Sequence, residues 1–191
     1  MAATENKVQF NLKKVHYAVM NTGGSTPTWA TPVPVPGAVN ISLEAQGELN
    51  KFYADGMVYY QSSSNAGYEG DLEMARFIDK MLQDVWGYIS DATSKVMIET
   101  VNAEPKSFAL LFQIDGDADN DLYCLYNCTG TRPGIAAATS TETKEPQTQT
   151  STISAAPLEN GYVFARTTAE TSEDVRNAWF TKVWEKTGVG A

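Results

Sequence analysis

Short segments in which apolar and polar residues alternate run along most of the chain, and they predict a mainly β protein. These segments are rich in β-branched or aromatic residues and are separated by turn residues. In one of them, Tyr68, Leu72 and Met74 share a face, and acids occupy the other, as in a half-buried strand. Segment 107–114 is apolar on both faces, which predicts a central strand covered from two sides. The predicted strands are 7–20, 37–49, 56–64, 67–75, 95–101, 107–114, 121–130, 147–157 and 161–168.

Two segments have helical instead of strand periodicity. The first covers 77–86 and stops at Gly87, and the second covers 172–184, with Ser172 as the expected N-cap. The expected architecture is therefore a β-sandwich with about two α-helices. The apolar positions at helical spacing are Phe77, Met81 and Val85 in the first segment and Val175, Trp179 and Val183 in the second.

Two stretches have the composition of long loops. Residues 21–37 are rich in Gly, Thr and Pro, and the prolines favour an extended loop over membership of a ladder. Residues 134–150 are polar and rich in threonine. Because compact domains seldom contain structureless loops of this length without a functional reason, both are expected to be assembly arms. The 191 residues suffice for one core, so we expect a single domain over 1–191.

Charge and hydropathy exclude several classes of function. Asp and Glu number 23 against 14 Lys and Arg, and the net charge of −9 disfavours binding to nucleic acid phosphates. The first residues contain no apolar run typical of a signal peptide, and no stretch of about 18 apolar residues occurs. The sequence thus predicts a soluble cytoplasmic protein with no membrane partner.

The stretch "QIDGDADNDLYCLYNC" (113–128) places four aspartates at every second position and resembles a calcium loop at first sight. An EF-hand needs Gly at its sixth position and a bidentate Glu at its twelfth, but Asn120 and Tyr126 stand there. We therefore expect a hairpin turn and no metal site. The aspartates are Asp115, Asp117, Asp119 and Asp121.

The candidate catalytic and cofactor residues do not form a recognisable set. Cys124 and Cys128, if both lie on one strand, share a face about 13 Å apart, too far for a disulfide, and read as buried structural thiols. His16 is the single histidine and reads as a structural strand residue. Nucleophile-elbow, phosphate-loop and dinucleotide-binding motifs are absent from the sequence. We expect no enzyme activity, catalytic residue or cofactor.

An ordered set of stretches carries a family resemblance: "GAVNISLEAQGELNKFYADGMVYY", "GYEGDLEMARF", "PKSFALLFQIDGD", "LYNCTGTRPG" and "TETKEPQTQT", with "AWFTKVW" near the end. Together they resemble the major tail proteins of long-tailed bacteriophages, the siphophage type of Gram-positive hosts. The resemblance runs from about Lys7 to Trp184. It implies a β-sandwich flanked by a helix, without the additional immunoglobulin-like domain of some relatives.

The resemblance also implies a role and partners. Six copies would close into a ring through a shared β-barrel, and the rings would stack into a tail tube that conducts DNA during ejection. The chain would then be a virion protein, assembled in the bacterial cytoplasm, with tail terminator, tape measure and distal tail proteins as partners. DNA would pass without specific binding, since a ring of six would carry six times −9, or −54 formal charges.

The acids on predicted strands are the candidates for the wall of such a tube. The candidate lumen-lining residues are Glu44, Glu48, Glu69, Asp71 and Glu73. The competing interpretation is that these acids simply face outer solvent. Two other functions remain open: a tube protein of a contractile injection system, and a non-catalytic β-sandwich carbohydrate-binding module.

Overall fold

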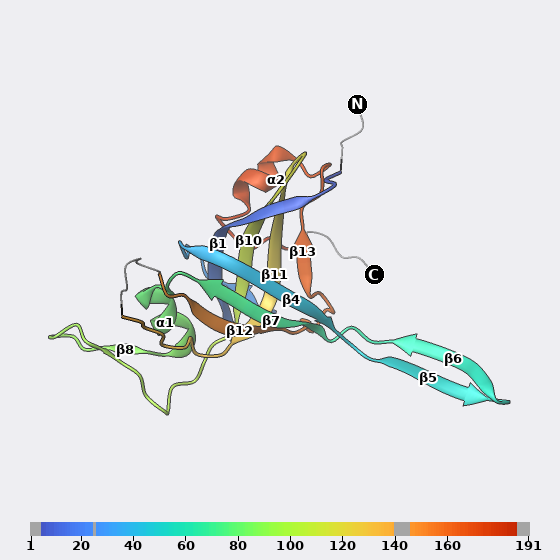
Figure 1. The fold of residues 1–191 in the computed structure, drawn as a ribbon, viewed down its shortest axis with the longest axis horizontal. Coiled ribbons are helices and arrows are strands. Elements are labelled where there is room, and N and C mark those ends of the chain that lie inside the picture. Colours follow the sequence, from blue (N-terminus) through green and yellow to red (C-terminus); the bar gives the residue numbers. More distant parts are fainter. Residues whose placement is uncertain (1–4, 25, 140–145, 187–191) are drawn as a thin grey trace.

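The computed structural model describes residues 5–24, 26–139 and 146–186, and in this part of the chain it confirms a mainly β fold with two short helices (Figure 1). The strands are β1 Gln9–Asn21, β2 Thr28–Trp29, β3 Val33–Pro34, β4 Ala38–Gln46, β5 Leu49–Ala54, β6 Met57–Ser63, β7 Gly67–Met74, β8 Ile89–Ser90, β9 Met97–Ile98, β10 Phe108–Gly116, β11 Asn120–Gly130, β12 Gln149–Ala155 and β13 Phe164–Arg166. The helices are α1 Asp79–Trp86 and α2 Glu173–Ala178.

One antiparallel sheet forms both layers of the sandwich. Its strand order is β2-β1-β10-β11-β12-β7-β4, with β3 paired to β1 and β13 paired to β11. Strand β11 changes partner along its length: Tyr123–Leu125 pair with β13, and Cys128–Gly130 pair with β12. The sheet can therefore bend after β11, and the layer of β12, β7 and β4 lies across the layer of β1, β10 and β11 (Figure 1).

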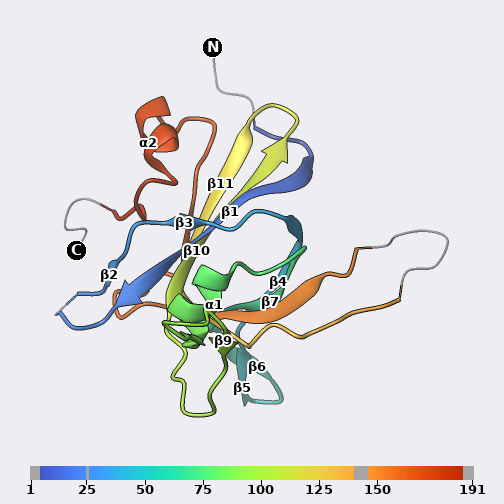
Figure 2. The ribbon, with the colours of Figure 1, turned by 90° about the vertical axis from the view of Figure 1, so that its left-hand side faces the viewer.

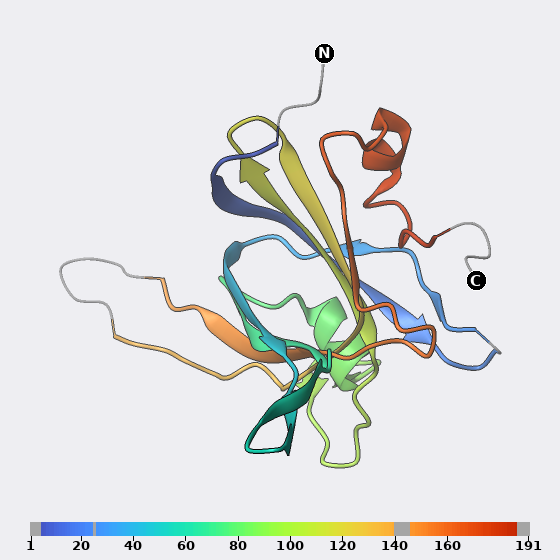
Figure 3. The same ribbon diagram turned by 90° about the vertical axis from the view of Figure 1, so that its right-hand side faces the viewer.

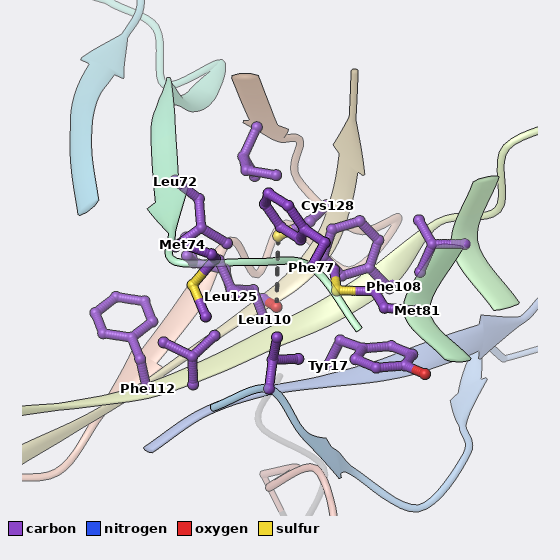
Figure 4. Close-up of a cluster of buried hydrophobic side chains, with 14 of the residues drawn as sticks. Tyr17, Leu72, Met74, Phe77, Met81, Phe108, Leu110, Phe112, Leu125 and Cys128 are labelled. Atoms are coloured by element: carbon purple, nitrogen blue, oxygen red, sulfur yellow. Dashed lines mark hydrogen bonds between the residues drawn. The ribbon is translucent and has the colours of Figure 1, made fainter. Parts of the chain in front are cut away.

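Strand β10 is the centre of the fold, as its two-sided apolar pattern predicted. Phe108, Leu110 and Phe112 point into the main core between the layers, where they meet Leu72, Met74 and helix α1 (Figure 4). Ala109 and Leu111 point the other way, into a second core. That second core is covered by residues after α2, among them Trp179 and Val183. Burial on both faces explains why this segment contains no surface residue before Ile114.

The two helices fall where the periodicity placed them, with one difference in length. Gly87 ends α1 in the left-handed conformation at φ 70°, which glycine adopts at little cost. Helix α2 stops at Ala178, so Trp179 and Val183 belong to an irregular segment and do not form the predicted helical stripe, although both are buried. Ser172 is its N-cap residue by position, but its side chain makes no capping hydrogen bond. Neither helix of the described residues is long and apolar enough to cross a membrane.

The expectation that prolines keep 21–37 out of the ladder is wrong in two places. Val33 and Pro34 pair with β1, and Thr28 and Trp29 pair with its far end. These strands lie on the outer edge of the sheet, where a proline without an N–H leaves no neighbouring strand unpaired. Segment 95–101 is also less regular than predicted, because only Met97 and Ile98 form a strand, paired with β8.

The two cysteines are buried and free, but they do not share a face. Cys124 belongs to the second core and Cys128 to the main core. Between them the register shifts: Phe108 opposes Cys128, whereas Leu110 opposes Leu125. The extra residue of this bulge reverses the alternation, which the sequence pattern did not reveal. Burial raises the pKa of both thiols, so neither is reactive at neutral pH.

His16 is a structural strand residue on β1, as predicted, and its ring lies 4.6 Å from that of Phe180 in the C-terminal segment. Desolvation by burial lowers the pKa of His16 below 6.5, although its ring nitrogen contacts the Lys14 carbonyl. A histidine whose pKa is lower in the folded state favours unfolding once pH falls below its unfolded value. We predict that the free energy of unfolding drops more between pH 7.5 and 5.5 in the wild type than in His16→Gln. Equal drops in urea titrations would contradict this.

Candidate functional site: an acidic sheet face and a protruding apolar hairpin

The alternating acids of β7 lie on the outer face of the layer formed by β4, β7 and β12. On β7, Leu72 and Met74 point into the core, whereas Glu69 and Asp71 are exposed and Glu73 is half-buried. These three strands contain no lysine, arginine or histidine. The register places Glu44, Glu69 and Ser154 in one row, Ser42, Asp71 and Thr152 in the next, and Asn40, Glu73 and Thr150 in the third.

Four of the five candidate lumen residues thus share one face. Glu44 lies directly opposite Glu69 across the β4–β7 ladder. Like charges at such a position destabilise a sheet by roughly 0.2–1 kcal/mol, so the stability of the isolated chain does not explain them. Glu48 lies apart, beyond the end of β4, where its backbone N–H donates to the Ser64 hydroxyl at 2.9 Å.

Threonines of the neighbouring chain segment hold two of the acids in place. The Thr152 hydroxyl donates to the Asp71 carboxylate at 2.8 Å, and the Thr148 hydroxyl donates to Glu73 at 2.5 Å. Hydroxyl donors orient a carboxylate without neutralising its charge. We call this surface, made of Glu44, Glu69, Asp71 and Glu73 with the hydroxyls beside them, the acidic face.

The hairpin of β5 and β6 is the second unusual surface. It extends from the body along the longest axis of the molecule (Figure 1), and neither core contains any of its residues. Asp55 and Gly56 form its turn with φ of 53° and 76°, the two positive values of a type I′ hairpin. The exposed large side chains at its outer end, the hairpin tip, are Phe52, Tyr53, Met57, Val58, Tyr59 and Tyr60.

The residue pattern of 56–64 predicted β6, whereas β5 and the hairpin were not predicted. The available signal was the pair Asp55-Gly56 between two aromatic-rich runs, which is a strong short-range indication of a hairpin. Six exposed apolar side chains on one narrow arm are uncommon for a monomer, and such surfaces mark sites of protein contact.

A second apolar arm projects at the other end of the long axis (Figure 1). It is the loop that contains β8 and β9, and its exposed apolar residues include Ile89, Val96, Ile98 and Val101, the last 93% exposed. Its flank is anchored by ordinary contacts, such as the Tyr88 hydroxyl donating to Glu99 at 2.8 Å. The molecule therefore has unlike apolar surfaces at opposite ends.

The predicted assembly arms differ in form. Within segment 21–37, of which residue 25 lies outside the described residues, 28–29 and 33–34 pair with β1. Trp29 donates from its indole nitrogen to the Tyr126 carbonyl at 3.0 Å. The chain between β11 and β12 projects from the body on both of its described flanks (Figures 2 and 3). Residues 140–145, within the predicted arm 134–150, lie outside the described residues. The role of both segments in assembly stays a prediction.

Of the four aspartates of 113–128, Asp117 and Asp119 lie in the hairpin turn between β10 and β11, as predicted, whereas Asp115 belongs to β10 and Asp121 to β11. Asp115 forms an ion pair with Lys13 at 2.5 Å, and Asp117 accepts the backbone N–H of Lys7 at 2.7 Å. Asp119 forms an ion pair with Arg176 of α2. The partners therefore draw these carboxylates apart toward the N-terminal strand and the C-terminal helix. The absence of a metal site stays a prediction, as does the absence of catalytic and cofactor residues.

Comparisons with known proteins add little to this geometry. No family model matches the sequence, and no curated protein matches it. Among the solved structures that align with this chain is one described as "Cryo-EM structure of the anti-feeding prophage cap (AFP tube terminating cap)"; the alignment covers 88% of this chain and 98% of that chain, at 11% identity and a TM-score of 0.37. A TM-score this low supports no inference about a shared fold or function.

Proposed function

We propose that this protein is the structural subunit of a phage tail tube and polymerises as stacked hexameric rings that conduct DNA. The observation that supports this best is the combination of a base-free acidic face with an apolar hairpin tip that belongs to neither core of the described residues. The first surface suits a wall along which DNA slides, and the second suits contact with another subunit. The sequence resemblance to major tail proteins points in the same direction.

The position of the apolar arms favours open-ended assembly. A symmetric dimer uses one surface twice, whereas unlike surfaces at opposite ends join head to tail and generate rings or filaments. The β5–β6 hairpin and the β8–β9 loop are unlike in length and sequence and lie at opposite ends of the long axis (Figure 1). Head-to-tail assembly would cover both, each against a different surface of a neighbouring copy.

The acidic face gains a function in such a tube. DNA carries about one negative charge per 1.7 Å, and like charges on a wall keep it from adhering. A face with four acids and no base repels a polyanion along its whole length. Tail terminator, tape measure and distal tail proteins are the partners that this role requires, and the virion tail is its location.

Electron microscopy of the purified protein tests the proposal. Tubes or stacked rings of uniform diameter are the expected result at high protein concentration, with sedimentation velocity to follow the oligomer size. The acidic face should line the bore in a reconstruction. A protein that stays monomeric at all concentrations and salt conditions, alone and with tail tip components, would overturn the proposal.

We predict that replacing Glu69, Asp71 and Glu73 together by Lys slows DNA ejection from assembled virions. The substitution changes the net charge per chain from −9 to −3. Attraction between the new ammonium groups and DNA phosphates should retard transit, and more severely at low salt, because the screening length grows from roughly 8 Å at physiological salt to about 30 Å at 0.01 M.

A control with the same charge change isolates the position of the charges. Glu159, Glu170 and Glu173 are exposed and lie outside the acidic face, so their replacement by Lys should leave ejection kinetics unchanged. Both variants should form tubes of normal length. Equal ejection rates for the two triple variants would remove β7 from the inner wall.

A further inference from the structure

We infer that the tip of the β5–β6 hairpin inserts into an apolar groove between the two layers of a second copy of this chain. This inference rests on the proposed self-assembly and specifies its contact. It depends on two features of the described chain, an open apolar groove and the exposed apolar tip of the β5–β6 hairpin.

The groove lies between β4 and β7 on one side, the latter through Tyr68, and β10, β11 and β13 on the other. Its volume is about 220 Å³, and Ile41 and Leu43 of β4 form one wall. The opposite wall is a series of aromatic rings. Phe112 stacks on Tyr123 with centroids 5.1 Å apart, Tyr123 lies 6.4 Å from Phe164, and Phe164 meets Tyr68 edge to face at 5.6 Å.

The chemistry of the groove favours side chains over a cofactor. Its lining contains no Asp, Glu, Lys, Arg or His, and the only polar side-chain groups are the hydroxyls of Tyr68 and Tyr123. Its volume is below the roughly 300–1,000 Å³ of pockets for drug-sized ligands. Phe164, at 42% exposure, leaves a ring edge open to solvent. The groove thus suits one or two apolar side chains that add to its ring series.

The hairpin tip has the matching form because it is apolar on both faces. Phe52 pairs with Tyr60, and Met57 lies on the same face because it pairs with Ala54, two residues along β5 from Phe52. Tyr53 pairs with Val58 on the other face. The groove has room for one or two side chains, and either face of the tip can supply apolar side chains that enter it. The base of the hairpin, with Asn50, Lys51, Gln61 and Ser62, is polar and would stay in solvent.

A second copy is the occupant that the molecule itself supplies. The hairpin of the same chain extends away from the body (Figure 1), and none of its residues lines the groove. The β8–β9 loop is a poorer match because its strands have only two residues each and present no ribbon with two faces. Each copy has one tip and one groove, so the contact is head to tail and repeats from copy to copy.

Cysteine cross-linking between two separately purified variants tests the contact. One variant carries Tyr60→Cys at the tip, and the other carries Phe164→Cys at the groove rim, where 42% exposure makes misfolding a small risk. Leu43→Cys on the opposite wall is the second groove variant. Native Cys124 and Cys128 are buried and unreactive, so they do not compete. The two proteins are mixed under assembling conditions, oxidised mildly and separated on a non-reducing gel.

We expect a disulfide-linked heterodimer with either groove variant. Tyr60→Cys mixed with Ile89→Cys, an exposed position on the opposite arm, is the matched control and should give at least about tenfold less product, a ratio that corresponds to roughly 1.4 kcal/mol of preference. Assembly without a cross-link to either groove position would overturn this inference and leave the proposed function standing. Failure of the wild type to assemble at all would overturn both.

Discussion

Replacing both Phe52 and Tyr60 by serine should leave the monomer folded and prevent assembly at concentrations where the wild type forms tubes. The two side chains are 60% and 63% exposed and belong to neither core, so their loss removes only a cross-strand pair from the monomer. Such a pair contributes roughly 0.2–1 kcal/mol. In an assembled tube both aromatic side chains would be buried, and burial of one large apolar side chain contributes roughly 1.5–3 kcal/mol.

The double substitution should therefore weaken each contact by about 3–6 kcal/mol, which raises the concentration needed for assembly more than about 100-fold. Sedimentation velocity and electron microscopy measure assembly, and circular dichroism checks the fold. The next pair toward the body, Lys51 and Gln61, is equally solvent-facing and provides the control. Lys51→Ser with Gln61→Ser should assemble as the wild type does. Normal tubes from the Phe52 and Tyr60 variant would exclude the tip from the contact.

Trp86→Ala should produce the largest loss of monomer stability among single core substitutions in α1. Trp86 is 1% exposed, and its ring meets Phe77 edge to face at 5.5 Å. Its indole nitrogen donates to the Gly130 carbonyl at 2.9 Å, at the point where β11 ends. Truncation of a buried Trp to Ala costs roughly 3–5 kcal/mol, and loss of the hydrogen bond to the half-buried Gly130 carbonyl adds about 1 kcal/mol or more.

That loss is comparable with the total stability of a typical domain, about 5–15 kcal/mol, so much of the variant should be unfolded at 37 °C. Urea titration measures this loss of stability, with unfolding monitored by far-ultraviolet circular dichroism because that signal reports on the backbone and not on tryptophan. Trp86→Phe keeps most of the packing but removes the hydrogen bond, and it should cost only about 1–3 kcal/mol. A loss below about 1 kcal/mol for Trp86→Ala would show that α1 is not anchored through this side chain.

The sequence by itself determined the parts of the fold that depend on local periodicity. Alternation along 67–75 separated the core side chains of β7 from its acids, and the two-sided apolar run at 107–114 identified the central strand. Gly87 marked the end of α1 because only a residue tolerant of positive φ ends a helix there without strain. These features follow from neighbours within a few residues, whose preferences are readable in one segment.

The sequence was less informative where partners are distant in the chain. The pairing of Glu44 with Glu69 requires the β4–β7 register, which no local pattern specifies. The bulge before Cys128 put the two cysteines into different cores, although their spacing suggested one face. Pro34 lies in the ladder because its strand happens to be an edge strand. An edge, a bulge or a register is a property of two or more strands together.

The candidate surfaces divide in the same way. The acids of β7 and the aromatic residues of the hairpin are visible in the sequence, and so is the absence of bases from β4, β7 and β12. Only the tertiary structure showed that β4 and β7 combine these acids into one face, beside the hydroxyls of β12, and that the aromatic hairpin is exposed where it leaves the body. Whether an apolar side chain joins the core or stays exposed for an interface depends on whether distant parts of the chain pack over it, and a local sequence pattern does not specify that.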